Sequence, residues 1–189
     1  MGSTVFPVPS TSSSSTQKWT QIASYTSTTN VPTIDFNDIP QTYRSLRLVI
    51  NGIVKQTTND QLYMRFNSNS GNNYAWWGWV ATGTTYLSSY RYVDQTVFTL
   101  TSPGININTT RYFSGTIDIY NYAEVNAAKQ VAYKSQWQES PYYYNETVSG
   151  NWNTGASTPA VTSINLIVGS GDMNIIGSNS NGIFLYGGN

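Results

Sequence analysis

The sequence predicts an all-β fold, an antiparallel β-sandwich or jelly roll preceded by an extended N-terminal arm. Three observations support this prediction. Apolar and polar residues alternate in short runs, clusters of turn-forming residues separate the runs, and no stretch has a helical period. Strict alternation buries one face of a strand and leaves the other in solvent, as in antiparallel sheets. With 189 residues, the chain has room for one such domain.

The chain is predicted to divide into an arm, residues 1–18, and a sandwich domain, residues 19–189. The arm is rich in Ser, Thr and Pro and has no apolar period, so it cannot form a core. A floppy tail has a similar composition. The apolar side chains of Val5, Phe6 and Val8 favour an arm that orders against a neighbouring protein, because a pure linker does not need them.

Alternation is clearest in the runs that contain Leu46, Leu62, Ile117 and Ile164. Asn, Gly, Ser and Pro cluster between the runs and predict turns. The segment 169–172 superficially suggests a phosphate-binding loop, but it lacks the lysine of that motif and is interpreted as a hairpin turn. Further strands are predicted at residues 19–25, 33–36, 74–80, 96–100, 130–138, 142–148 and 183–186.

The charge composition argues against two classes of partner. Nine basic and nine acidic residues give a formal net charge of zero. Nucleic-acid binding needs clustered Lys and Arg, and so does binding to an anionic membrane surface. Neither partner is therefore expected. The N-terminus also lacks the pattern of a secretory signal, so we expect synthesis in a host cytoplasm.

The chain contains no Cys and no His. It therefore lacks thiolate nucleophiles, the commonest general base and the commonest transition-metal ligand. A glycosidase needs only two facing carboxylates, so the presence of Asp and Glu is weak evidence for activity. We expect no enzymatic activity, no catalytic residue, no metal and no cofactor. Without His or Cys, stability should also change little between about pH 6 and 8.

Two aromatic segments allow alternative interpretations. Exposed Trp and Tyr are typical of protein interfaces and of surfaces that stack on sugars. Core packing with subunit contacts is one interpretation, and a glycan site is the other. Alternation places Trp77 and Trp79 on one face of a strand and Trp76 on the opposite face. The candidate subunit or glycan contacts are Trp76, Trp77, Trp79, Tyr142, Tyr143, Tyr144 and Trp152.

Several motifs occur in a recognisable order. The chain resembles a family of tail-fibre and capsid-surface proteins of tailed bacteriophages, common in phages of cyanobacteria. Each motif alone is short, whereas the ordered set spans residues 19–187. The motifs are Trp19-Thr20-Gln21-Ile22, the segment 34–43 followed by Leu46-Arg47-Leu48, Arg65-Phe66-Asn67, the strand 115–122, Ser163-Ile164-Asn165-Leu166 and Phe184-Leu185-Tyr186-Gly187.

The resemblance implies a β-sandwich that assembles as a homotrimer on the exterior of the virion. Two roles agree with it, a capsid decoration (cement) protein or a tail-fibre component, and the arm would supply the attachment to other virion proteins. The alternative function is a carbohydrate-binding, host-recognising domain of a tail fibre. The segments around Trp76–Trp79 and 142–152 depart from the family pattern as aromatic-rich insertions.

Overall fold

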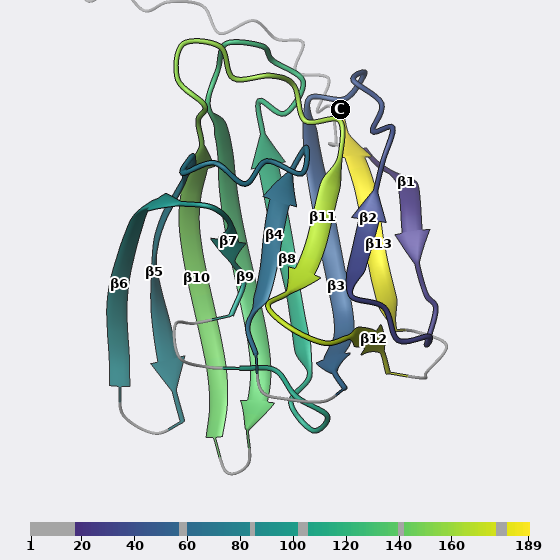
Figure 1. Cartoon of the computed structure of the whole chain (residues 1–189), viewed down its shortest axis with the longest axis vertical. Coiled ribbons are helices and arrows are strands. Elements are labelled where there is room, and N and C mark those ends of the chain that lie inside the picture. The colour runs from purple at the N-terminus through teal and green to yellow at the C-terminus, as the bar shows by residue number, and fades with distance from the viewer. Residues whose placement is uncertain (1–17, 57–59, 84–85, 102–105, 140–141, 177–180) are drawn as a thin grey trace, which may run out of the picture.

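The computed structural model describes residues 18–56, 60–83, 86–101, 106–139, 142–176 and 181–189. Within them, thirteen strands form two antiparallel sheets that lie face to face (Figure 1), which confirms the predicted β-sandwich. The described residues contain no helix, and hence none that could cross a membrane. The predicted attachment residues Val5, Phe6 and Val8 lie outside the described residues.

The large sheet has nine strands and the small sheet has four. The large sheet runs β1-β13-β3-β8-β9-β10-β5-β6, with β12 also pairing with β3, and the small sheet runs β2-β11-β4-β7. A jelly roll has eight strands in two sheets, so that alternative is not confirmed. The strands are β1 (Trp19–Tyr25), β2 (Thr33–Phe36), β3 (Ser45–Lys55), β4 (Leu62–Phe66), β5 (Tyr74–Thr82), β6 (Tyr86–Gln95), β7 (Phe98–Thr99), β8 (Phe113–Tyr120), β9 (Lys129–Glu139), β10 (Tyr142–Trp152), β11 (Ile164–Val168), β12 (Met173–Ile175) and β13 (Gly182–Gly188).

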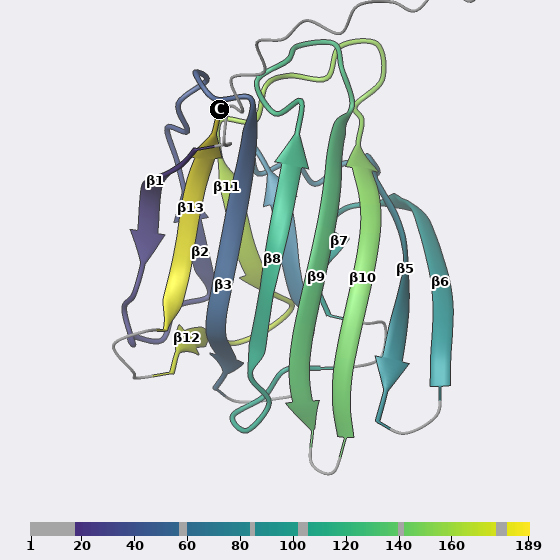
Figure 2. The same ribbon diagram turned by 180° about the vertical axis from the view of Figure 1, so that it is seen from behind.

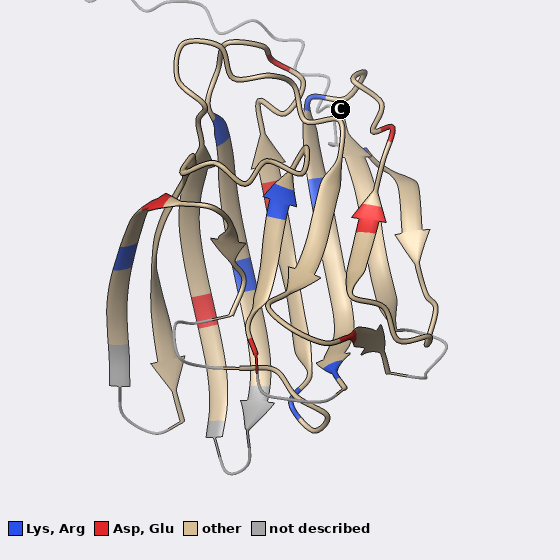
Figure 3. Ribbon diagram, in the orientation of Figure 1, with Lys and Arg blue, Asp and Glu red and all other residues tan. Residues whose placement is uncertain are grey.

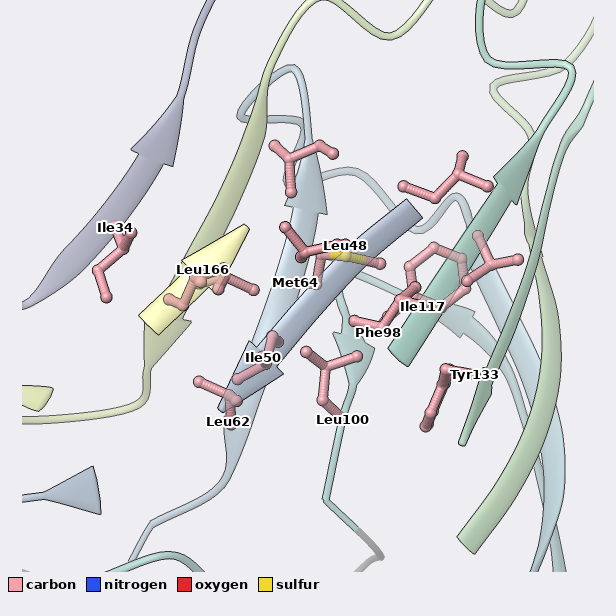
Figure 4. Close-up of a cluster of buried hydrophobic side chains, with 14 of the residues drawn as sticks. Ile34, Leu48, Ile50, Leu62, Met64, Phe98, Leu100, Ile117, Tyr133 and Leu166 are labelled. Atoms are coloured by element: carbon pink, nitrogen blue, oxygen red, sulfur yellow. The ribbon is translucent and has the colours of Figure 1, made fainter. Parts of the chain in front are cut away.

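The core lies between the small sheet and the inner face of the large sheet. Leu62 and Met64 of β4 meet Leu48 and Ile50 of β3 there (Figure 4), and all four are buried. These residues alternate with polar or half-exposed neighbours along both strands, as predicted. Burial of such apolar side chains contributes about 1.5–3 kcal/mol each, which makes this layer the main source of stability.

Aromatic rings fill one end of the core. The ring of Phe98 lies edge-on to Tyr74 at 5.0 Å and to Phe66 at 5.7 Å. Trp152, fully buried, packs on Phe66 at 5.6 Å. Gly150 makes this packing possible, because a Cβ at that position would lie 2.9 Å from the Phe98 ring. The aromatic surplus of the sequence is therefore in large part core.

Both aromatic-rich segments form strands as predicted, since they belong to β5 and β10, which pair with each other inside the large sheet. The structure corrects two other details of the sequence-based prediction. Strands β6 and β12 were not predicted. The segment 169–172 is no hairpin turn, since it leads from β11 in the small sheet to β12, which pairs with β3 of the large sheet.

Candidate ligand-binding site

The large sheet turns one face, here called the outer face, away from the small sheet (Figure 2). Strand pairing arranges the side chains of this face in rows across the sheet. One row holds Arg47, Asp118, Ala132, Ser149, Trp77 and Arg91 in neighbouring strands. The next row holds Val49, Thr116, Lys134, Thr147 and Trp79, and a third holds Asn51, Ser114, Gln136, Asn145 and Ala81.

Three adjoining hollows form a continuous groove along β8, β9 and β10 on the outer face. Their volumes are about 280, 390 and 410 Å³. The first and second hollows share Thr116, Lys134 and Thr147, and the second and third share Ser114, Gln136 and Asn145. From the row of Ser149 to Tyr143, six residues of extended strand give the groove a length of about 20 Å. A linear ligand fits this shape.

The groove arises from side-chain size. Its central strands carry Ser, Thr and Ala, such as Thr116, Ala132 and Ser149. The flanking strands carry longer side chains, with Arg47 on β3 and the indoles of β5 on the other side. Short hydroxyl side chains leave a depression and also line it with hydrogen-bond donors and acceptors.

Two tryptophans and one tyrosine border the groove. Trp77 and Trp79 are 46% and 49% exposed, and they are the cross-strand partners of Ser149 and Thr147 in the groove. Tyr143 is 61% exposed and lines the far hollow. All three residues belong to the outer face, because Tyr143 alternates in phase with Thr147 along β10. Exposed rings next to hydroxyl and amide groups suit an amphipathic ligand.

Two of the remaining predicted contact residues lie in the core, and a third, Tyr144, lines the third hollow beside Tyr143. Trp76 is 2% exposed and stacks on Tyr92 on the inner face, and Trp152 is fully buried. Both are core residues in this fold, which agrees with the core-packing interpretation. Tyr144 is half-buried and stacks on Trp137 at 5.4 Å. The side chain of Tyr142 lies outside the described part of the structure.

An ion pair lies at the end of the groove that Ser149 lines. Arg47 donates two hydrogen bonds to the Asp118 carboxylate, at 2.7 and 2.9 Å. The Trp19 ring lies 4.4 Å from the Arg47 guanidinium and packs against it. The hydrogen bonds that Arg47 donates to the Asp118 carboxylate raise the pKa of Arg47 above its ordinary value. The family-like motifs Trp19–Ile22 and Leu46–Leu48 thus meet at this point on the outer face.

Lys134 lies in the middle of the groove and is exposed. Lys134 takes part in neither of the two ion pairs that join described side chains, Arg47 with Asp118 and Lys55 with Asp60. Figure 3 shows how sparsely charge is distributed over both sheets. The ammonium group of Lys134 therefore makes the electrostatic potential in the middle of the groove positive.

Glu146 contributes to the groove floor, but its side chain points to the inner face and is 2% exposed. The Tyr90 hydroxyl donates to one carboxyl oxygen, and Ser135 Oγ donates to the other at 2.9 Å. Burial raises the pKa of Glu146 to about 9. This value contradicts the expectation of a stability that is constant between pH 6 and 8. No signal in the sequence marked Glu146, Tyr90 or Lys134.

Both acidic residues that line the groove are engaged by neighbouring side chains. Glu146 is held inside the sheet by Tyr90 and Ser135, on the side opposite the groove. Asp118, the other acidic residue of the groove, is held by Arg47. In the described residues, no three Asp or Glu side chains gather where they could hold a metal ion. No protein-family model, curated protein or solved structure matches the chain.

Proposed function

We propose that this chain is a polysaccharide-binding domain on the exterior of a bacteriophage virion. One observation carries the binding function: Trp77, Trp79 and Tyr143 stand exposed around a groove lined with hydroxyl and amide side chains. Sugar rings present an apolar face that stacks on indole and phenol rings, and hydroxyl groups that need hydrogen-bond partners. The groove offers both along one line.

The virion setting rests on the ordered sequence motifs. In the structure these motifs become strands of the two sheets, from β1 at one end of the chain to β13 at the other. They build the fold, and two of them also contribute Arg47, Thr116 and Asp118 to the groove. Attachment to the particle through Val5, Phe6 and Val8 of the arm completes the proposal. In this role the domain is part of a tail fibre or a capsid decoration.

A subunit contact in a homotrimer is the second candidate for the same face. The exposure of Trp77 and Trp79 favours it, because Trp is enriched at protein interfaces. The lining of the groove favours the polysaccharide. Lys134 and Gln136 lie at its centre, whereas the buried centre of a protein interface is depleted in charged residues.

The test is binding of the full chain to an array of bacterial capsular and O-chain polysaccharides. We expect binding that the substitution Trp79→Ala reduces at least about fivefold, because stacking of a nucleic-acid base on one aromatic ring contributes about 1–3 kcal/mol. Tyr120→Ala is the matched control. Tyr120 is a similarly exposed aromatic residue, 44% exposed, and it lies on β8, three strands away from Trp79 on β5.

Two results would argue against this function. Absence of binding to every polysaccharide on the array would remove it. Equal loss in the Trp79→Ala and Tyr120→Ala variants would show that binding does not use the groove. If Trp79→Ala instead converts a trimer into a monomer, the face is a subunit contact.

A further inference from the structure

We infer that the ligand of the groove is an acidic polysaccharide, whose carboxylate groups pair with Lys134 while its rings stack on Trp79. This inference rests on the proposed function and adds the chemical class of the ligand. It is carried by the position of Lys134 relative to the aromatic border and by the charges around it.

Strand register fixes the spacing between the cation and the ring. Lys134 of β9 pairs with Thr147 of β10, and Thr147 pairs with Trp79 of β5. Lys134 and Trp79 therefore lie two strand spacings apart, about 9–10 Å between Cα atoms. Only Thr147, with its short side chain, stands between them on the outer face. A sugar stacked on Trp79 lies within reach of the flexible lysine side chain.

The acidic groups nearby do not neutralise Lys134. Asp118 lies one row away, and Arg47 binds both of its oxygens. Glu146 directs its carboxyl group to the inner face, where burial raises its pKa. Arg91, the cross-strand partner of Trp77, adds a second positive charge on the same face. The groove and its border thus carry a positive excess in a protein of zero formal net charge, which favours an anionic ligand over a neutral one.

Matched ligands separate charge recognition from sugar recognition. The probes are polygalacturonate, alginate and hyaluronate, each beside its carboxyl-reduced form, in which the acid is a primary alcohol, together with neutral galactan and dextran. Binding of the full chain is measured at low and at high NaCl. We expect at least one acidic probe to bind more tightly than its reduced form, and added salt to reduce the difference.

Substitutions at Lys134 test the assigned residue. We expect Lys134→Gln to weaken binding of the acidic probe about 3- to 10-fold, between the effect of an exposed ion pair and that of a charge-assisted hydrogen bond. Binding of the reduced probe should not change. Lys134→Arg should retain the preference for the acidic form. Arg44→Gln, which removes an exposed cation outside the three hollows, is the control. Melting temperatures identify any variant that fails to fold.

The outcomes distinguish this inference from the function on which it rests. Equal binding of acidic and reduced probes, or a Lys134→Gln variant that keeps the acidic preference, overturns the inference. The proposed function survives in that case if Trp79→Ala still abolishes binding. If neither the probes nor the polysaccharide array show binding, both are rejected.

Discussion

Glu146 gives the stability of this protein a dependence on pH in a range where ordinary carboxyl groups no longer titrate. Its carboxyl group lies on the inner face of the large sheet, in hydrogen-bond contact with Tyr90 and Ser135. Burial raises its pKa from 4.5 to about 9. The folded protein therefore keeps this proton at neutral pH, whereas the unfolded chain, with an ordinary glutamate, has lost it.

The size of the effect follows from proton linkage. Between pH 4.5 and about 9, unfolding releases one proton from Glu146, so a rise in pH favours the unfolded state. The free energy of unfolding should fall by about 1.4 kcal/mol per pH unit, or nearly 3 kcal/mol from pH 6 to 8. For a domain of this size, that change corresponds to a decrease of about 5–10 °C in melting temperature.

Urea unfolding at pH 6, 7 and 8 measures this slope. The variant Glu146→Gln keeps the shape of the side chain and an acceptor for the Tyr90 hydroxyl, but it has no proton to lose. We expect its free energy of unfolding to be nearly constant over this range. The free energy of unfolding of the variant, relative to that of the natural protein, should therefore increase with pH. Asp94→Asn, at an exposed site, is the control and should keep the slope of the natural protein.

Two results would refute the reasoning. A free energy of unfolding that changes by less than about 0.5 kcal/mol between pH 6 and 8 would mean that Glu146 is already ionised in the folded state. A Glu146→Gln variant with the same slope as the natural protein would place the titrating group elsewhere.

Three further predictions concern packing, the arm and assembly. Gly78→Ala should destabilise the protein by about 1–3 kcal/mol in urea unfolding, because the new Cβ would lie 2.8 Å from the Thr147 carbonyl oxygen and 2.9 Å from the Tyr90 hydroxyl. A loss of stability below about 0.5 kcal/mol would mean that the neighbouring strands shift to make room for the methyl group at little cost. Deletion of residues 1–18 should leave the melting temperature nearly unchanged but abolish attachment to particles that lack the protein, and a truncated chain that still attaches would show that the arm is only a tail. Light scattering of the isolated protein should report a trimer, and a monomer at micromolar concentration would contradict the family resemblance.

Local sequence determined the strands and the side chains that share a face. Strand β4 occupies the predicted run, and its burial alternates along the strand, because period-two alternation is a local property of the chain. The same property placed Trp77 and Trp79 opposite Trp76. Strand β6 was missed because its sequence, YLSSYRYVDQ, mixes aromatic, apolar and polar residues on both faces, and it lies at an edge of the sheet. Strand β12 is only three residues long.

Tertiary structure decided which face became the core. Alternation predicts that Trp76 and Trp77 lie on opposite faces of the strand, but it does not predict which face is buried. Trp76 is buried because it packs against Phe98 and Tyr92. For the same reason, Glu146 looked like an ordinary polar residue of its strand. Its inward orientation and its hydrogen bonds to Tyr90 and Ser135 arise from the pairing of β9, β10, β5 and β6.

The groove is also a product of strand order. Lys134, Thr147 and Trp79 are distant in the sequence and become neighbours because β9, β10 and β5 are adjacent in the sheet. Sequence alternation determined the direction of each side chain relative to its own strand. The order and register of the strands, which depend on non-local pairing and on the burial of one face against the small sheet, determined which side chains meet.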